Sequence, residues 1–148
     1  MRAKLTRRGF LTGAAAGAGG LACLNARGQA VAAAVKKPLR VALIGCGNGR
    51  GLPVLLPEAC KERVVALVDA DRRQIEKALG IVSKKVSPGA AAEVKTFSDY
   101  RKLFDVMGSE LDAVLIATPN HHHALPALLA IRRGIHVYVE KPMARTLG

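Results

Sequence analysis

The stretch LRVALIGCGNGRG, residues 39–51, joins a short aliphatic run to a turn that holds four glycines. The aliphatic run ends at turn residues, which predicts a buried strand over residues 39–45. A helical stretch is expected directly after the turn, near residues 50–61. This strand–turn–helix unit decides the fold, because a strand that enters a crossover helix returns to the sheet as a parallel strand.

The same alternation continues to the end of the chain. Four further strands are predicted, over residues 63–69, 93–97, 111–117 and 135–140. Helical stretches are expected between them, near residues 72–79, 99–107 and 121–133. Strands that alternate with helices predict an α/β fold with a doubly wound parallel sheet, in the expected strand order 3-2-1-4-5-6.

A few residues mark the ends of these helices. Ser98 is expected to cap the helix near residues 99–107, with Asp99 in its first turn. Gly134 follows two arginines, which is typical of a helix end. Pro57 and Pro126 lie inside two helical stretches, so those helices are expected to start late or to kink.

The composition fits one ordinary α/β domain. Half of the 148 residues are hydrophobic and only 3% are aromatic, as in sheets whose strands are buried on both faces. The net charge is +12, and five of these charges fall in residues 1–34, which contain no acid. The other 18 Lys and Arg, against 11 Asp and Glu, are spread over predicted helix surfaces without a basic stripe or interleaved aromatics. Nucleic acid is therefore not expected as a partner.

Residues 1–34 have the three-part plan of an export signal. A basic start leads into a glycine-rich apolar run that is too short for a membrane span, and small polar residues follow. The sequence TRRGFL, residues 6–11, closely resembles the twin-arginine consensus. The alternative, an amphipathic first helix, lacks a polar stripe. We expect residues 1–34 to be a twin-arginine signal peptide, residues 35–148 to be the folded domain, and the protein to be periplasmic.

The glycine turn has the composition of a dinucleotide-binding site. The first glycine permits a tight turn, the second lets the backbone approach the pyrophosphate, and a third lets helix and strand pack closely. The sequence departs from G-x-G-x-x-G, and either Gly49 or Gly51 could fill the third role. A glycine-rich turn with no ligand is the alternative. The residues expected to bind the cofactor here are Gly45, Gly47, Asn48, Gly49 and Arg50.

Asp69 ends the second predicted strand, 24 residues after Gly45. An acid at this place accepts hydrogen bonds from the adenosine ribose hydroxyls and repels a 2′-phosphate, which favours NAD over NADP. Arg72 and Arg73 follow closely and could accommodate that phosphate instead. Asp71 is expected to cap the next helix.

Two further motifs follow later strands. ATPNHHH, residues 117–123, follows the fourth strand, and EKP, residues 140–142, ends the fifth. Together with the glycine turn and Asp99-Tyr100, they closely resemble the glucose–fructose oxidoreductase/inositol dehydrogenase (Gfo/Idh/MocA) family over residues 39–148. The resemblance implies a Rossmann domain followed, in family members, by a second α/β domain that closes the substrate site and mediates assembly into oligomers. This chain is accordingly expected to be a fragment or a truncated product.

The resemblance also implies roles for residues of both motifs. Thr118, Pro119 and Asn120 would line the nicotinamide-ribose and phosphate region, with His123 beside them. From the second motif, Glu140 would bind ribose hydroxyls, and Lys141 would lie between nicotinamide and substrate and polarise the substrate oxygen.

The positions of these residues agree independently with such a site, because ligands in open parallel sheets bind beyond the carboxyl ends of the strands. The alternative for Glu140 and Lys141 is a surface ion pair. The three consecutive histidines, residues 121–123, point in different directions and have no Cys or acid cluster beside them, so no metal is expected. Cys46 and Cys60 are expected to be free thiols.

The leading functional hypothesis is hydride transfer between a nicotinamide cofactor and a sugar or polyol hydroxyl, with Lys141 taking part in removal of the hydroxyl proton. A glycoside hydrolase of the same family, which recycles NAD within each turnover, is the second hypothesis. A non-catalytic cofactor sensor is the third. The substrate itself cannot be named from this sequence.

Overall fold

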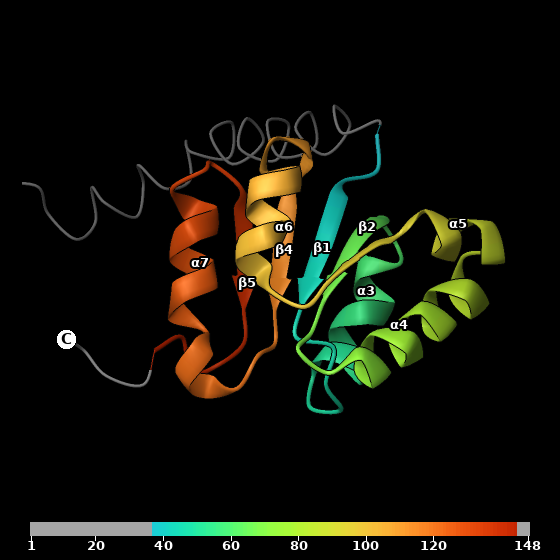
Figure 1. Ribbon diagram of the computed structural model, residues 1–148, viewed down its shortest axis with the longest axis horizontal. Coiled ribbons are helices and arrows are strands. Elements are labelled where there is room, and N and C mark those ends of the chain that lie inside the picture. Colours follow the sequence, from blue (N-terminus) through green and yellow to red (C-terminus); the bar gives the residue numbers. More distant parts are fainter. Residues whose placement is uncertain (1–36, 145–148) are drawn as a thin grey trace, which may run out of the picture. The chain divides into compact units, whose positions relative to one another are not determined.

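The computed structural model describes residues 37–144, and within them five parallel strands form one sheet in the order β3-β2-β1-β4-β5 (Figure 1). The strands are β1 (Arg40–Ile44), β2 (Arg63–Val68), β3 (Lys95–Phe97), β4 (Ala113–Ile116) and β5 (His136–Val139). Each of the five predicted strands is present, and the predicted order of these five is confirmed. The predicted signal peptide, residues 1–34, lies outside the described residues.

Helices connect consecutive strands and cover both faces of the sheet (Figure 1). A π-helical turn η1 (Gly51–Leu55) and α3 (Leu56–Ala59) follow β1, and α4 (Arg72–Lys85) and α5 (Pro88–Glu93) follow β2. After β3 come α6 (Tyr100–Met107) and a 3-10 turn η2 (Gly108–Glu110), and after β4 come a 3-10 turn η3 (Asn120–His122) and α7 (Ala124–Ile131). The predicted doubly wound α/β fold is therefore confirmed.

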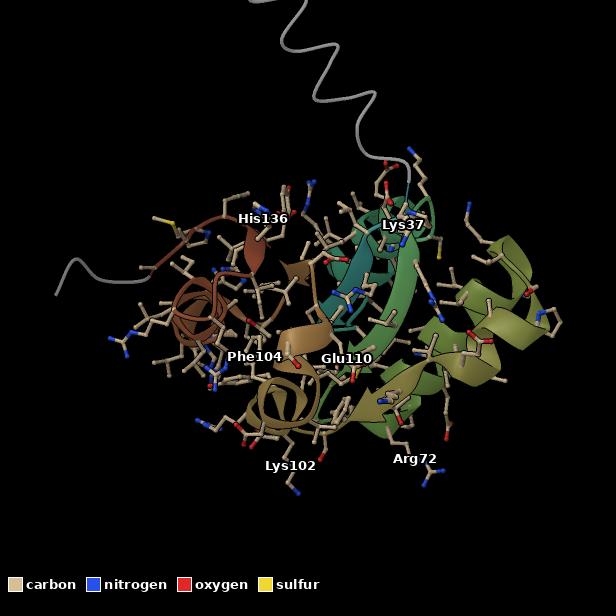
Figure 2. All side chains as sticks on the ribbon, turned by 90° about the horizontal axis from the view of Figure 1, so that it is seen from above. Lys37, Arg72, Lys102, Phe104, Glu110 and His136 are labelled. Carbon is tan, nitrogen blue, oxygen red and sulfur yellow. The ribbon has the colours of Figure 1, made fainter. Side chains whose placement is uncertain are left out.

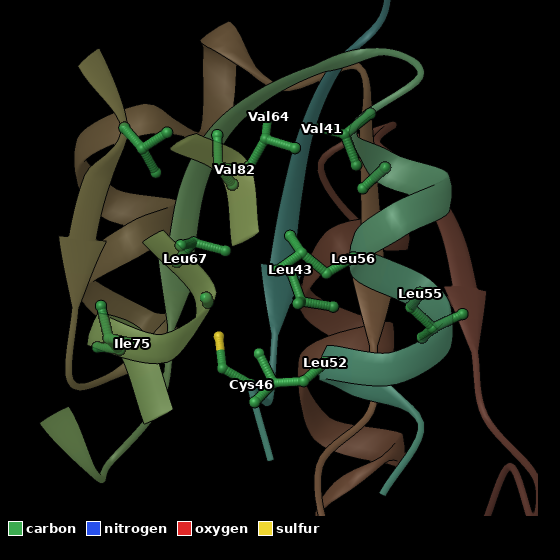
Figure 3. Close-up of a cluster of buried hydrophobic side chains, with 13 residues drawn as sticks. Val41, Leu43, Cys46, Leu52, Leu55, Leu56, Val64, Leu67, Ile75 and Val82 are labelled. Carbon is green, nitrogen blue, oxygen red and sulfur yellow. The ribbon is translucent and has the colours of Figure 1, made fainter. Parts of the chain in front are cut away.

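The core lies on both faces of β1, whose residues alternate between them because strand side chains have a period of two. Val41 and Leu43 pack toward α3 and α4, in the cluster that Figure 3 shows, together with Leu56 and Leu67. The other face of the sheet, which includes Ile44, packs against α6 and α7. Burial on both faces explains why β1 is aliphatic at every position after Arg40.

Three details of the helices differ from the sequence predictions. The helix after β2 runs to Lys85 rather than ending near residue 79, and the short helix α5 was not predicted. The cap of α6 is Asp99, whose carboxylate accepts from the Arg101 amide, so the prediction of Ser98 as the cap was wrong by one residue. The hydrogen bonds from Arg101 to Asp99 and its charge hold the pKa of this carboxyl below its usual value.

Other helix ends agree with the sequence. Asp71 caps α4 by accepting from the Arg73 amide. Gly134 follows α7 with φ +72°, a conformation that favours glycine. Pro57 and Pro126 both lie near the start of their helices, α3 and α7, which begin late as expected.

Figure 2 shows charged side chains on the outside of this domain, for example Arg72 and Lys102, which point away from the ribbon, whereas Glu140 is buried. No helix among residues 37–144 is long and apolar enough to cross a membrane.

Candidate functional site

The carboxyl ends of β1, β2, β3 and β4 surround a cavity of about 520 Å³, and Glu140 and Lys141, which follow β5, are not among its lining residues. Asp69 follows β2, Thr118 and Pro119 follow β4, and all three line this cavity together with Gly45 from the turn after β1. The turn that leads into α6 contributes Tyr100 and its neighbours. The structure thus brings together residues that are far apart in the sequence, because parallel strands present their carboxyl ends at one edge.

The glycine turn packs directly against the loop after β4. Gly45 has φ +92°, and a β-carbon there would lie 2.6 Å from the carbonyl carbon of Ala117. A β-carbon on Gly51 would collide with the carbonyl oxygen of Gly45, whereas Gly47 and Gly49 face open space. Gly51 therefore fills the close-packing role, which decides between the two glycines that the sequence left open. The backbone at Gly47 is free to be approached by a ligand.

A π-helical turn explains the unusual glycine spacing. Gly51 lies six residues after Gly45, one more than in G-x-G-x-x-G. Three amides in this region bond five residues back: Leu52 to Gly47 at 3.1 Å, Leu55 to Arg50 at 2.8 Å, and Leu56 to Gly51. Such a turn accommodates an additional residue within a helix and is frequent at functional sites. The extra residue is thus absorbed without moving the close contact between helix and strand.

Asp69 connects two turns at the edge of the cavity. One carboxylate oxygen accepts from the Cys46 amide at 2.7 Å and the other from the Asp71 amide at 2.8 Å. A carboxylate oxygen can accept more than one hydrogen bond, so each oxygen of Asp69 can still accept a bond from a ribose hydroxyl. Asp69 therefore also holds the glycine turn against the start of α4, a role that sequence reasoning missed.

The two arginines after Asp69 already have carboxylate partners. Arg73 contacts both oxygens of Asp71 at 2.9–3.2 Å, and Arg72 contacts Glu76 at 3.2 Å. The hydrogen bonds from the Arg73 side chain and amide hold the pKa of Asp71 below its usual value. A 2′-phosphate would have to compete with these carboxylates for either guanidinium.

Thr118 carries an unused polar group in the cavity wall. Its hydroxyl oxygen is buried and has no hydrogen-bond partner within the described part of the chain. A buried hydroxyl without a partner is costly, and a hydroxyl-rich ligand such as a ribose would satisfy it. This orphaned hydroxyl and the open glycine backbone together fit a dinucleotide cofactor.

Glu140 and Lys141 do not pair with each other as a surface ion pair. The side chain of Glu140 is 9% exposed, and one of its oxygens lies 2.7 Å from Arg50 Nε and 3.1 Å from the Tyr138 hydroxyl. Burial raises the pKa of Glu140, but the hydrogen bonds from Tyr138 and Arg50 and the Arg50 charge outweigh burial and lower it. Lys141 is exposed. Arg50 and Glu140 were both predicted as cofactor ligands, and the structure pairs them with each other.

The three histidines separate into two kinds. His121 and His122 are exposed and line the cavity, and their ring centroids lie 4.4 Å apart with the ring planes tilted by 53°. His123 is 1% exposed, with Nε2 2.7 Å from the Thr118 carbonyl oxygen and Nδ1 2.7 Å from that of Pro142. Residues 37–144 contain no group of three or more His, Cys, Asp or Glu that could hold a metal ion.

The remaining predicted ligands are peripheral. Asn48 and Asn120 are exposed, one in the glycine turn and one in η3. Cys46 and Cys60 are free thiols, as predicted. Burial and the nearby Asp69 charge raise the pKa of Cys46 to about 12, so this thiol remains protonated under the glycine turn.

Comparisons with known proteins agree with this geometry. The model of the Gfo/Idh/MocA oxidoreductase family, described as an NAD-binding Rossmann fold, matches residues 39–148. Glycosyl hydrolase family 109 protein 1 of Bacteroides fragilis is 34% identical over 110 residues, which are 74% of this chain and 23% of that protein. Levoglucosan dehydrogenase of Pseudarthrobacter phenanthrenivorans is 39% identical over 72 residues, 44% of this chain and 18% of that protein.

Among solved structures, myo-inositol 2-dehydrogenase of Lactobacillus plantarum superposes with a TM-score of 0.59 at 25% identity. The match covers 75% of this chain and 30% of that one. The chain thus spans less than a third of the length of each of these three proteins.

Proposed function

The chain belongs to the Gfo/Idh/MocA oxidoreductase family, and from this premise we propose that it is the NAD-binding part of an enzyme that transfers hydride to or from a sugar or polyol hydroxyl. The observation that carries the proposal is the unpartnered Thr118 hydroxyl in a cavity bounded by the glycine turn and Asp69. Two of the proteins it resembles are named as dehydrogenases of a sugar or a polyol.

The protein residues have separate tasks in this mechanism. NAD, when bound, accepts or returns the hydride. The backbone at Gly47 is open to the pyrophosphate, and the Asp69 carboxylate accepts from a ribose hydroxyl. The exposed Lys141 side chain would accept the hydroxyl proton when hydride leaves the substrate carbon, and would donate a proton to the substrate oxygen when hydride returns.

Glu140 requires a rearrangement to reach a ribose. Its carboxylate is held by Arg50 and Tyr138, and both are donors. A carboxylate oxygen has room for a further donor, so ribose binding is compatible with the Tyr138 bond. In this rearrangement the ribose hydroxyl takes the place of Arg50 on the Glu140 carboxylate. The half-exposed Arg50 side chain is then available to bind the anionic pyrophosphate.

The experiment is an assay of NADH formation across a panel of sugars and polyols with the whole protein that contains this chain. We expect Lys141→Met to lower kcat by on the order of a hundred- to ten-thousandfold, the usual contribution of one acid–base group. Lys102→Met, an exposed lysine on α6, is the matched control. Unchanged kcat in Lys141→Met would remove Lys141 from the mechanism.

The similarity to family 109 glycosyl hydrolases supports a second candidate function, NAD-dependent glycoside hydrolysis. Such an enzyme oxidises, eliminates and then reduces within one turnover, so NADH does not accumulate. Release of the aglycone from a nitrophenyl glycoside without net NADH would favour the hydrolase. Net NADH on addition of a free sugar would favour the dehydrogenase.

We also infer that the protein is exported by the twin-arginine route. This inference rests on TRRGFL, residues 6–11, and on the absence of acids from residues 1–34. That route carries folded proteins, so the nicotinamide cofactor would be bound in the cytoplasm and held tightly during export.

A further inference from the structure

The loops after β4 and β5 carry the residues to which the proposed function assigns chemistry, and one buried side chain connects them. His123 lies directly before α7 and is 1% exposed. Its Nε2 faces the Thr118 carbonyl in the first loop, and its Nδ1 faces the Pro142 carbonyl in the second, each at 2.7 Å. His123 is therefore placed between the two loops, and the cavity itself is lined by its exposed neighbours His121 and His122.

We propose that His123 is a positioning residue for Lys141. In this proposal the Nδ1–H donates to the Pro142 carbonyl and thereby fixes the loop that begins with Lys141 against the segment after β4 to which His123 itself belongs. The catalytic role of Lys141 rests on the proposed function. The contact of His123 with Pro142, which we call the bridge, does not depend on it.

The position of the bond explains why it matters. The β4–β5 ladder ends with the bond from the Glu140 amide to the Ile116 carbonyl at 3.0 Å. Beyond it, the Lys141 amide bonds to the Glu140 carboxylate, and the contact between His123 and the Pro142 carbonyl ties the loop back to the segment after β4. A lysine on an untethered loop would visit many positions, and a misplacement of about 1 Å at a reacting group costs on the order of a hundredfold in rate.

Amide substitutions separate the two contacts. The nitrogen of an asparagine side chain occupies the place of Nδ1, and that of a glutamine side chain occupies the place of Nε2. His123→Asn thus keeps the donor for Pro142, His123→Gln places its amide at the Thr118 side and loses that donor, and His123→Ala removes the polar group altogether. The matched control is His136→Ala, which removes an exposed histidine at the start of β5, at the opposite end of the strand from Lys141 (Figure 2).

The first measurement is ¹⁵N relaxation of backbone amides in the full chain, read at Lys141 and Met143 against Val114 in the core. In His123→Gln and His123→Ala we expect the order parameters at Lys141 and Met143 to fall from about 0.85 to below about 0.6 while Val114 is unchanged. His123→Asn and His136→Ala are expected to match the native chain. If His123→Ala does not fold, the order parameters of His123→Asn and His123→Gln are sufficient to test the proposal.

The second measurement is turnover by the whole protein that contains this chain. We expect His123→Gln to lower kcat by on the order of a hundredfold with KM for NAD unchanged, and His123→Asn to restore most of kcat. The proposal would be overturned if the Lys141 and Met143 amides stayed rigid in folded His123→Gln. It would also be overturned if His123→Asn and His123→Gln lost kcat equally. Failure of Lys141→Met to reduce turnover would instead overturn the proposed function, and the relaxation result would still test the bridge.

Discussion

Gly49 and Gly51 look alike in the sequence but have different surroundings. A β-carbon on Gly51 would meet the Gly45 carbonyl, and one on Gly49 would meet open space. The sequence therefore predicts that a glycine is needed for close packing, but the path of the π-helical turn decides which one. Asp69 is a similar case. A carboxylate at the end of the second strand predicts a ribose ligand, but its bonds to the Cys46 and Asp71 amides are visible only in the fold.

The contrast between the two glycines is directly testable. Gly51→Ala forces the turn away from Gly45, and overpacking of this kind costs about 1–3 kcal/mol in the free energy of unfolding. Gly49→Ala has room for its methyl group and is expected to stay within about 1 kcal/mol of the native chain. Urea unfolding measures both. Equal destabilisation by the two substitutions would contradict the role given to Gly51.

Substitution of Asp69 tests the choice of cofactor. Removing a hydrogen bond to a charged group costs about 1.5–3 kcal/mol, so Asp69→Ala should weaken NAD binding by about ten- to a hundredfold and narrow its advantage over NADP. Titration with both dinucleotides measures this, and urea unfolding in parallel reports the loss of the bonds to the two turns. Asp105→Ala, an exposed acid on α6, is the control. A native preference for NADP would point to Arg72 or Arg73.

At the scale of elements, strands were predicted better than helix ends. β1 after Arg40 and β4 are unbroken aliphatic runs whose two faces are buried or half-buried, and such runs stand out in a sequence. α5 has no buried residue among Pro88–Glu93, so it lacks the apolar periodicity that predicts a helix. Asp99 and Ser98 are both good caps, and the choice between them depends on where the turn after β3 ends.

The ion pair between Arg40 and Asp112 joins the starts of β1 and β4. Asp112 accepts from the Arg40 amide at 2.7 Å and from its guanidinium at 3.0 and 3.1 Å. Hydrogen bonds from the Arg40 side chain and amide lower the pKa of Asp112 below its ordinary value of 3.8. The ionised carboxylate is thus favoured in the folded chain, and it stabilises the fold at pH values above 3.8.

We therefore expect Asp112→Asn to lower the free energy of unfolding at neutral pH. The difference between the variant and the native chain should shrink as pH falls through the lowered pKa of Asp112, because the native carboxyl is then protonated as well. Urea unfolding of both chains at pH 7 and at about pH 3 measures the two differences. Asp105→Asn serves as the control, and a difference that grows in acid would reject this explanation.

At the scale of the whole molecule, the candidate site could be predicted as a location better than as a set of contacts. The carboxyl edge of a parallel sheet follows from the order of the elements, so residues after β2, β4 and β5 were expected to meet there. The links from Arg50 to Glu140 and from His123 to Pro142 join loops at this edge, but the sequence does not show which side chains pair across them. Both depend on the twist and register of the finished sheet.

The export proposal also belongs to the whole chain. Replacing Arg7 and Arg8 together by Lys should block transfer to the periplasm while the folded domain accumulates in the cytoplasm. Arg27→Lys, in the same segment but outside the pair, should leave export intact. Cell fractionation and immunoblotting measure both variants. Normal export of the double variant would rule out the twin-arginine route.

The central position of β1 has a consequence for the time that synthesis takes. Val41 pairs with Ala113 of β4, which the ribosome adds 72 residues later. At about 5–20 residues per second, the nascent β1 waits about 4–14 s for this partner. β2 is made sooner and can pair with the other edge of β1, so half of the sheet can assemble first. The face of Ala42 and Ile44 is covered in the folded chain by Leu103 and Phe104 of α6, so it stays uncovered until that helix emerges, shortly before β4.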